Sequence, residues 1–256
     1  MDNVVIVTGA ASGMGRACVD HAKTLGNVVF AVDITAPDIE GTIGVACDVT
    51  DPSAIAALVA RVSAAGSFRA LIHAAGVSPT MGDARKIFNI NLVGTQQILN
   101  AFEPLVVPGS AAVCFASTAA HQVAVYVTPD QVALVDDPLA ADFLDHAEAA
   151  VASDSGFAYA LSKVGVIQVV NRAGKAWGRK GGRVTSVSPG IIDTPMGRLE
   201  LEHQPAMQDM LAATPLSRLG RAEEVAAVAV FLASDAASFV SGIDVLVDGG
   251  LVRSGG

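Results

Sequence analysis

The chain has 256 residues, 52% of them hydrophobic and 16% charged, so it is long enough for one large α/β domain with an extensive core. The formal net charge of −9 gives no support for binding nucleic acid or anionic membranes. No apolar run approaches the roughly 18 residues of a membrane span, and the N-terminus lacks a basic stretch leading into an apolar one, so we expect no secretory signal. Three scattered cysteines have no metal-like spacing, and their odd number fits a reducing compartment, so we expect a cytoplasmic protein without a metal site.

Short β-rich runs alternate with helical stretches along the chain. The expected strands are 3–9, 27–33, 42–48, 70–76, 111–117, 183–190 and 244–250. The expected helices are 13–25, 52–65, 86–103, 157–178 and 222–234. Asp51 could cap the second helix, with Pro52 at its first position. Most strands are continuously apolar, which favours a parallel sheet covered by helices on both faces, within a single α/β domain spanning 1–256.

The segment 118–156 breaks this alternation. It carries proline and acidic clusters and one expected helix near 138–152. Such a length is unusual for a simple connection between elements of a compact domain. We therefore expect the segment either to cover a functional site or to take part in assembly.

The turn after the first expected strand reads TGAASGMG (8–15), with glycines at Gly9, Gly13 and Gly15. Glycines let the backbone approach a pyrophosphate, and the following helix N-terminus supplies amide donors. Such a turn alone is weak evidence, but the second strand ends in Asp33, which can bind both ribose hydroxyls of an adenosine. A carboxylate there would also repel a 2′-phosphate, which favours NAD over NADP. Asp48, at the end of the third strand, could reach the adenine or belong to the turn.

Tyr159 and Lys163 are four residues apart in the expected helix 157–178, so they share one helix face. A free tyrosine has a pKa of about 10, which is poorly matched to proton transfer at neutral pH. A nearby ammonium would favour the phenolate and lower that pKa. The pair could then exchange a proton with an alcohol or carbonyl. Taken alone, the short pattern also fits an ordinary polar pair on a helix.

Several segments in combination resemble the short-chain dehydrogenase/reductase family across essentially the whole chain. They are TGAASGMG, Asp33, CDV (47–49), HAAG (73–76), NINLVG (89–94), FAS (115–117), YALSK (159–163), SPGIIDTP (188–195) and VDGG (247–250). The resemblance implies a Rossmann-like, doubly wound parallel sheet of seven strands in the order 3-2-1-4-5-6-7. The site is then expected at the carboxyl ends of the strands.

The resemblance also implies roles for individual residues. Tyr159 would be the catalytic acid/base, Lys163 would lower its pKa and bind the nicotinamide ribose, and Asn91 would hold a water of the proton relay. Asn91 also fits a kink or a core amide within its helix. The residues expected to bind NAD are Gly9, Ser12, Gly13, Met14, Gly15, Asp33, Asp48, Val49, Ala75, Gly76, Tyr159, Lys163, Pro189, Ile192 and Thr194.

The catalytic serine of this family ends the fifth strand, about a dozen residues before the tyrosine. Here the fifth expected strand ends at Ser117, which precedes Tyr159 by 42 residues. Because the strand end fixes the hydroxyl in space, we select Ser117 over Thr118, Ser153 and Ser155. Ser117 could also simply end the strand by bonding the nearby backbone.

The sequence departs from the family pattern at two further places. The family's NNAG reads HAAG, so His73 and Ala74 replace two amides, and we expect His73 to be a core residue with satisfied hydrogen bonds rather than a base. The interval from Gly76 to Asn91 is short. Together with the long segment 118–156, this resembles the bacterial 3α-hydroxysteroid dehydrogenase/carbonyl reductases within the family.

The segment 195–216 is where the family places its mobile substrate loop. Its apolar side chains are Met196, Leu199, Leu201, Met207, Met210 and Leu211, which suit either an irregular apolar substrate or a helix packed on its own domain. We expect an NAD-dependent enzyme that interconverts a bulky apolar secondary alcohol, hydroxysteroid- or terpenol-like, and its ketone. The alternatives are a 3-oxoacyl-type reductase and a non-catalytic dinucleotide-sensing protein. The resemblance further implies a homodimer or homotetramer.

Overall fold

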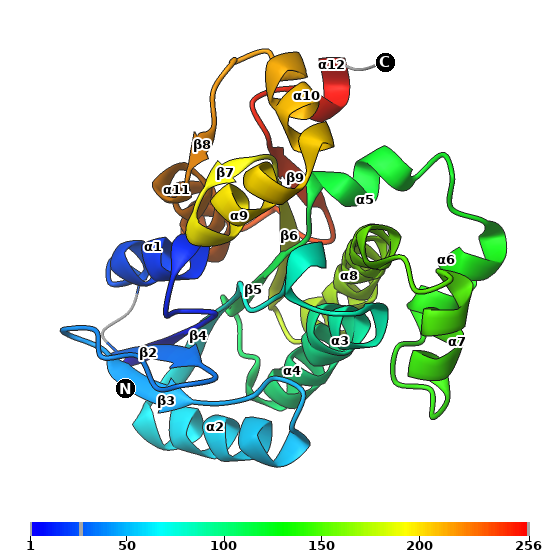
Figure 1. Ribbon diagram of the computed structural model, residues 1–256. Helices are drawn as coiled ribbons and strands as arrows, with labels where there is room; N and C mark the ends of the chain where they lie inside the picture. Colours follow the sequence, from blue (N-terminus) through cyan, green and yellow to red (C-terminus); the bar gives the residue numbers. More distant parts are fainter. Residues whose placement is uncertain (1, 26–27, 255–256) are drawn as a thin grey trace.

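The computed structural model describes residues 2–25 and 28–254 and is built around one seven-stranded parallel sheet. The strand order is β3-β2-β1-β4-β5-β6-β9, which confirms the predicted order with β9 as the seventh strand (Figure 1). The strands are β1 (Asn3–Thr8), β2 (Val28–Asp33), β3 (Ile43–Ala46), β4 (Ser67–His73), β5 (Ala111–Phe115), β6 (Arg183–Pro189) and β9 (Asp244–Val247). The expected second strand begins at Asn27, which lies outside the described residues.

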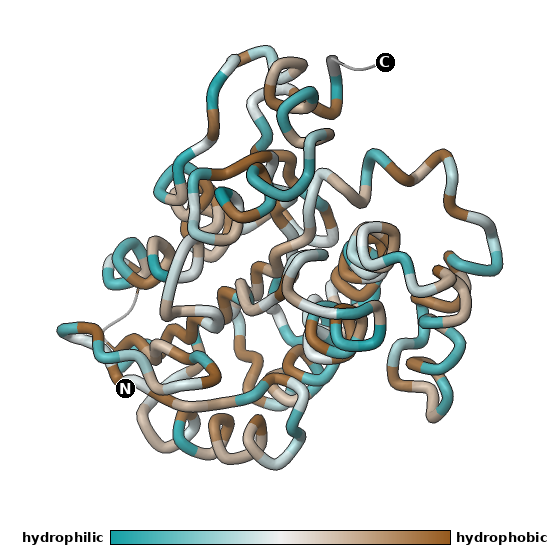
Figure 2. The backbone as a smooth tube through the Cα atoms, in the orientation of Figure 1, coloured by the Kyte–Doolittle hydropathy of each residue, from teal (hydrophilic) through white to brown (hydrophobic). Residues whose placement is uncertain are grey.

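The continuous apolar runs of the strands follow from burial on both faces of the sheet. Successive side chains of a strand point to opposite faces. In β1, Val4 and Ile6 join the hydrophobic cluster on one face, and Val5 and Val7 join the cluster on the other. All four side chains are fully buried. Figure 2 shows the corresponding hydrophobic colouring along the central strands.

Helices cover both faces of the sheet (Figure 1). One layer contains α2 (Pro52–Ala65), α3 (Ala84–Phe88), α4 (Gly94–Phe102) and α8 (Ser155–Gly178), and the other contains α1 (Gly13–Ala22) and α11 (Ala222–Ala233). Asp51 caps α2 as predicted, because its side chain accepts a hydrogen bond from the Ser53 amide. Among the described residues, no helix has the length and apolar character needed to span a membrane.

The expected helix 86–103 contains a wider turn. Its α-helical parts, α3 and α4, are joined by a π-helical turn over Asn89–Val93. Asn91 lies inside this turn and is buried, and its carbonyl oxygen accepts a hydrogen bond of 2.7 Å from Thr95 Oγ1. Such turns are rare and often occur at functional sites. The kink considered for Asn91 from the sequence is therefore a local change in helix type.

The segment 118–156 holds three helices where the sequence pattern predicted one near 138–152. They are α5 (Thr118–Val123), α6 (Pro129–Asp136) and α7 (Phe143–Ala150). Helix α6 packs closely on α8. A Cβ added to Gly165 of α8 would lie only 3.1 Å from the Cβ of Val135 of α6, so the absence of a side chain at Gly165 permits the close approach. Helix α7 packs on α3 through an edge-to-face contact of Phe143 with Phe88. The last two helices therefore extend the core on the α8 side of the sheet.

The segment after β6 forms two helices instead of a loop. These are α9 (Pro195–His203) and α10 (Pro205–Ala213). Before and after them, β7 (Ile192–Asp193) and β8 (Gly220–Arg221) pair as a small parallel ladder. Thr194 caps α9 by accepting a hydrogen bond of 3.0 Å from the Gly197 amide. The chain therefore leaves the main fold before α9 and returns to it after α10 at adjacent points.

Candidate active site

Two cavities meet at the carboxyl ends of the strands. The larger cavity has a volume of about 540 Å³ and extends from the glycine-rich turn toward α9. The smaller cavity has a volume of about 310 Å³ and lies among α5, α9 and α10. The residues that line both cavities are Met14, Ala116, Tyr159, Thr194 and Met196. A group bound in one cavity can therefore meet a group bound in the other beside Tyr159.

The glycine-rich turn is shaped for close backbone approach. Gly9 has a φ of 69°, and a Cβ there would lie 2.8 Å from the backbone of Ala74. A Cβ on Gly15 would lie 1.9 Å from the carbonyl oxygen of Gly9, so only glycine lets α1 start this close to the turn. Ser12, the N-cap of α1, is exposed in the larger cavity, and its hydroxyl makes no capping bond. Helix α1 therefore presents its N-terminal amides and a free hydroxyl to an anionic group.

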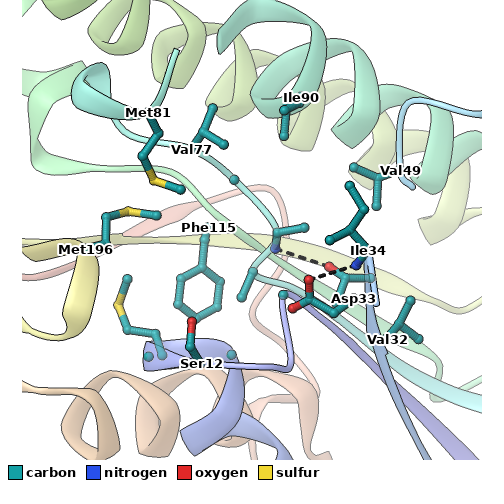
Figure 3. Close-up of a pocket in the computed structure, with 18 of the residues that line it drawn as sticks. Ser12, Val32, Asp33, Ile34, Val49, Val77, Met81, Ile90, Phe115 and Met196 are labelled. Atoms are coloured by element: carbon teal, nitrogen blue, oxygen red, sulfur yellow. Dashed lines mark hydrogen bonds between the residues drawn. The ribbon is translucent and has the colours of Figure 1, made fainter. Parts of the chain in front are cut away.

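Asp33 lies at one end of the larger cavity (Figure 3). Its carboxylate accepts hydrogen bonds of 2.9 Å from the Ala11 amide and 2.8 Å from the Ile34 amide. A carboxylate has about four acceptor positions, so positions remain for a ligand. The neighbouring Ile34 is 73% exposed and also lines the cavity. Sequence reasoning missed Ile34, because one apolar residue after a strand carries no distinctive signal.

Asp48 lines the larger cavity while fixing the turn after β3. Its Oδ1 accepts hydrogen bonds from the amide and the hydroxyl of Thr50, at 2.8 and 2.7 Å. Of the two roles considered from the sequence, the turn role is observed, and the contact with adenine stays a prediction for this cavity-lining residue.

The other end of the larger cavity is apolar. Met81 and Met196 approach it from different parts of the chain, with Phe115 between this end and Asp33 (Figure 3). Met81 belongs to the short 3-10 helix η1 (Pro79–Met81), and Met196 belongs to α9. The sequence indicated Met196 through the substrate loop but gave no indication of Met81 or Phe115.

Tyr159 lines both cavities at their junction, and Ser117 lines the smaller cavity close to it. Ser117 is 9% exposed and caps α5, where its Oγ accepts a hydrogen bond of 3.2 Å from the Ala119 amide. Its own hydroxyl hydrogen can then be donated to the Tyr159 oxygen. This hydrogen bond lowers the pKa of Tyr159, but burial is the larger effect, and the resulting pKa lies above its usual value. Ser117 therefore bonds the nearby backbone, as considered from the sequence, and its catalytic role stays a prediction.

Lys163 is buried, and its Nζ donates a hydrogen bond of 2.8 Å to the carbonyl oxygen of Phe115. Burial lowers the pKa of Lys163 from 10.5 to about 8. The Nζ lies 5.7 Å from the centroid of the Tyr159 ring. The expected lowering of the tyrosine pKa by this ammonium is not found, because burial dominates and the carboxylate of Glu200 also raises the Tyr159 pKa.

Asn91 supports the cavity wall without lining it. Its Oδ1 accepts a hydrogen bond of 2.8 Å from the Val77 amide, and its Nδ2 donates one of 2.9 Å to the Val77 carbonyl. Val77 itself lines the larger cavity. A Cβ on Gly76 would lie 3.1 Å from Asn91 Oδ1 and 3.6 Å from Lys163 Nζ, so the chain passes tightly beside both side chains. Asn91 therefore fixes the segment after β4.

His73 forms a buried hydrogen-bond chain behind the site. Its Nδ1 lies 2.8 Å from Thr8 Oγ1, and its Nε2 lies 3.1 Å from Thr95 Oγ1. Because Thr95 donates its hydrogen to the Asn91 carbonyl, it must accept from Nε2–H, which leaves Nδ1 to accept from Thr8. Burial lowers the pKa of His73 to about 3, so the ring is neutral. It matches the satisfied core residue considered from the sequence.

Glu200 is a site residue that sequence reasoning missed. It lies on α9, is 6% exposed and lines the smaller cavity. Its carboxylate accepts hydrogen bonds from Thr80 and Gln204. A glutamate in a stretch that also contains Glu202 and His203 looks like a solvated helix face, so the sequence gave no signal for its burial.

Of the catalytic and cofactor-binding residues proposed from the sequence, all except Asn91 line at least one cavity, whereas Leu199, Leu201 and Leu211 of the expected substrate loop line neither. Those that line the larger cavity are Gly9, Ser12, Gly13, Met14, Gly15, Asp33, Asp48, Val49, Ala75, Gly76, Tyr159, Lys163 and Thr194. The smaller cavity receives Met14, Ser117, Tyr159, Pro189, Ile192 and Thr194. Within 118–156, α5 supplies Gln122 and Val123 to the smaller cavity, whereas no residue of α6 or α7 lines either one. Among the described residues, no group of acidic, histidine and cysteine side chains could hold a metal ion.

Comparisons with known proteins identify the family. A sequence model of the family described as Enoyl-(Acyl carrier protein) reductase matches residues 9–131 and 144–252. An uncharacterized short-chain type dehydrogenase/reductase of Sinorhizobium fredii is 32% identical over 96% of this chain, which spans 43% of that relative's length. The D-threitol dehydrogenase of Mycolicibacterium smegmatis is also 32% identical, over 96% of this chain and 92% of its own length.

A solved structure agrees with the family and with the predicted subgroup. The crystal structure of the 3-alpha-hydroxysteroid dehydrogenase from Pseudomonas sp. B-0831 complexed with NADH superimposes with a TM-score of 0.81. It is 28% identical in sequence, and the match covers 98% of each chain. The sequence motifs, the sheet order, the two cavities and these similarities lead to one conclusion: the chain belongs to the short-chain dehydrogenase/reductase family, which is a family of oxidoreductases.

Proposed function

We propose that the protein is an NAD-dependent oxidoreductase that interconverts a bulky, mostly apolar secondary alcohol and its ketone. The single observation that carries this proposal is the placement of Tyr159 in the wall of both cavities, with Ser117 beside it in the wall of the smaller one. A proton-transfer group there can serve a carbinol in the smaller cavity beside a cofactor in the larger one. The 3-alpha-hydroxysteroid dehydrogenase similarity supports the same reading.

The larger cavity fits NAD. The α1 N-terminus with Ser12 would bind the pyrophosphate, and Asp33 would accept from the ribose hydroxyls while Ile34 packs on the adenine. Asp33 favours NAD over NADP, and among the described residues no arginine lines the cavity to bind a 2′-phosphate. Lys163 would reach the nicotinamide ribose. Pro189, Ile192 and Thr194 would hold the carboxamide, as the family resemblance implies, and Pro189 can offer only its carbonyl oxygen to a backbone hydrogen bond.

The reaction then needs three actions from the protein. When bound, NAD supplies the hydride acceptor, and NADH supplies the donor in the reverse direction. Ser117 holds the substrate oxygen by a hydrogen bond, and Tyr159 takes the hydroxyl proton during oxidation or returns it during reduction. Lys163, whose pKa is about 8 and whose Nζ lies 5.7 Å from the centroid of the Tyr159 ring, would place positive charge near the tyrosine, although burial outweighs it and keeps the Tyr159 pKa above its usual value. Asn91 keeps the segment beside Lys163 in place.

The smaller cavity suits a bulky apolar frame. Its apolar walls include Met14, Val123, Ile191, Ile192, Met196, Met207 and Met210. Thioether side chains adapt to irregular shapes, as a polycyclic or terpenoid alcohol requires. A volume of about 310 Å³ lies at the lower end of ligand cavities and is sufficient for one ring system.

A second candidate function is reduction of a 3-oxoacyl group on an acyl carrier. The description of the matching family as Enoyl-(Acyl carrier protein) reductase favours it. Asp33 weighs against it, because such reductases usually use NADPH, and the net charge of −9 is unfavourable for an acidic carrier. A dinucleotide-sensing protein is less well supported, since Tyr159, Lys163 and Ser117 are all in place.

The test is a substrate panel followed at the nicotinamide absorbance. Sterols, terpenols, sugar alcohols and a 3-hydroxyacyl thioester are each offered with NAD and with NADP in parallel. We expect turnover of the sterols or terpenols with NAD. Turnover of the thioester with NADP would favour the second candidate, and NAD binding without any turnover would favour a sensor.

The expectation of a homodimer or homotetramer stays a prediction. Apolar side chains such as Phe231, Phe239 and Ile243 are exposed near the outer edge of the sheet at β9. Burying exposed apolar surface of this kind would favour association of identical chains. Light scattering coupled to size exclusion, at two protein concentrations, would determine the assembly.

A further inference from the structure

Glu200 is a buried carboxylate without a charged partner. Only 6% of its surface is exposed, and no lysine, arginine or histidine of the described residues forms an ion pair with it. Its Oε1 accepts hydrogen bonds of 2.5 Å from Thr80 Oγ1 and 3.3 Å from the Thr80 amide, and its Oε2 accepts one from Gln204 Nε2. All three donors are neutral. Burying an uncompensated charge is costly, so this position is unfavourable for folding alone.

The carboxylate belongs to the wall of the smaller cavity, together with Ser117 and Tyr159. It is near enough to Tyr159 for its charge to raise the pKa of the phenol. For the proton transfer itself, a negative charge at this place is a disadvantage. The neighbouring walls are rich in methionine, and a charge in such apolar surroundings acts strongly on any group bound beside it. The charge is therefore better explained by the substrate than by the reaction.

We propose that Glu200 determines substrate specificity by accepting a hydrogen bond from a second polar group of the substrate, a hydroxyl or an ammonium. This inference rests on the proposed function and narrows it. The substrate is an alcohol with a largely apolar frame that carries a hydrogen-bond donor at a second position. Three of the about four acceptor positions of the carboxylate are occupied by the protein, which leaves one for the substrate. Substrates with an anionic group at that position are rejected by repulsion.

A purely structural role would have a different signature. The bonds to Thr80 connect α9 to η1, so Glu200 could act only as a link between these two segments. Loss of such a link would impair all substrates alike. Thr80→Val removes the hydroxyl side of the link and keeps the charge of Glu200, which makes it the matched control. Thr80 itself lines neither cavity.

The experiment compares trans-4-substituted cyclohexanols on the NAD-saturated enzyme, with hydrogen, hydroxyl, ammonium or carboxylate as the substituent. For the wild type, we expect kcat/KM for the better of the hydroxyl and ammonium substrates to exceed that of cyclohexanol by about tenfold or more, with the carboxylate lowest. Glu200→Gln should bring these ratios close to one, whereas Thr80→Val should preserve them. The ratio between the ammonium and hydroxyl substrates identifies the kind of donor.

Ratios that persist in Glu200→Gln, or equal losses for every substrate in both variants, would overturn the inference. Glu200→Met, an apolar replacement of similar length, repeats the test if the glutamine variant folds poorly. A binding measurement with compounds that have no alcohol group to oxidise tests this inference independently of the proposed function. Isothermal titration of the NAD-saturated protein with trans-4-methylcyclohexylamine and with the corresponding carboxylate should show that the wild type prefers the amine by about tenfold and that Glu200→Gln loses this preference. A wild type that binds both equally overturns the inference, whether or not any alcohol is turned over.

Discussion

The two cavities that meet at Tyr159 are built in different ways. The larger cavity is formed mainly by strand ends and their turns, where backbone atoms of β1, β2 and β4 and small residues such as Gly9 define its shape. The smaller cavity is formed mainly by side chains on the helices α5, α9 and α10. The first is a property of the sheet, and the second is a property of segments attached to it. Cofactor binding and substrate choice should therefore respond separately to substitution.

The largest difference between the effect on turnover and the effect on NAD binding should come from Tyr159→Phe. Removing the hydroxyl abolishes proton transfer, so kcat should fall by about 1,000-fold or more. The affinity for NAD, measured by titration calorimetry, should stay nearly unchanged because the turn and Asp33 are intact. Retained turnover would show that Tyr159 is not the acid/base.

Ser117→Ala should lower kcat by about 100-fold, because it removes the hydrogen bond that holds the substrate oxygen. The matched controls are Ser153→Ala and Ser155→Ala, since neither residue lines a cavity. Steady-state kinetics on the three variants gives the ranking. If a control loses more activity than Ser117→Ala, the catalytic serine has been misplaced.

A substitution of Asp33 tests the cofactor side of the comparison. Asp33→Ala removes acceptors from the expected ribose site, so KM for NAD should rise by about tenfold or more with little change in kcat. The preference for NAD over NADP should shrink, because the repulsion of a 2′-phosphate is lost. Equal losses in kcat and in NAD affinity would show that the two cavities are not separable.

The smallest effect concerns the stability contribution of Lys163. Its pKa is about 8 in the fold and 10.5 as the ordinary value, so the unfolded chain binds more protons between these two pH values. The free energy of unfolding should rise with pH in this window, by at most about 3.5 kcal/mol at about 1.4 kcal/mol per pH unit. Lys163→Met should lack this rise. Denaturant unfolding at pH 7.5 and at pH 10 measures it, and parallel curves for the two proteins would contradict the buried ammonium.

The sequence predicted the residues at the strand ends and turns better than the residues on the helices around the smaller cavity. Gly15 is recognisable because a Cβ there would collide with the Gly9 carbonyl oxygen, and Asp33 because the end of β2 places its carboxylate in the larger cavity. Ser117 could be chosen because the end of a strand places it in space, although 42 residues separate it from Tyr159. Glu200 could not be found, because its burial depends on how α9 lies against η1 rather than on a local pattern. The direction of the Tyr159 pKa also required the fold, since it depends on burial and on Glu200.

The segment 118–156 shows a second limit of sequence reasoning. The pattern predicted one helix, and the fold has three, of which α6 and α7 rest on α8 and α3. Short helices with few turns have weak periodicity, so their existence depends on contacts such as Val135 against Gly165. The cavity contacts of α5 agree with the suggested covering role of the segment, whereas its suggested role in assembly stays a prediction. Its first helix supplies the cavity wall, and the other two thicken the helical layer.

The short ladder of β7 and β8 has a consequence for the history of this protein. Because the chain enters and leaves the pair α9–α10 at neighbouring residues, this unit can change its length and side chains without disturbing the order of the main sheet. Substitutions in α9 and α10 would change the wall of the smaller cavity and leave the strands of the main sheet in place. The same junction offers a place for exchanging the unit between relatives, so that a new substrate range could be installed on an existing redox framework.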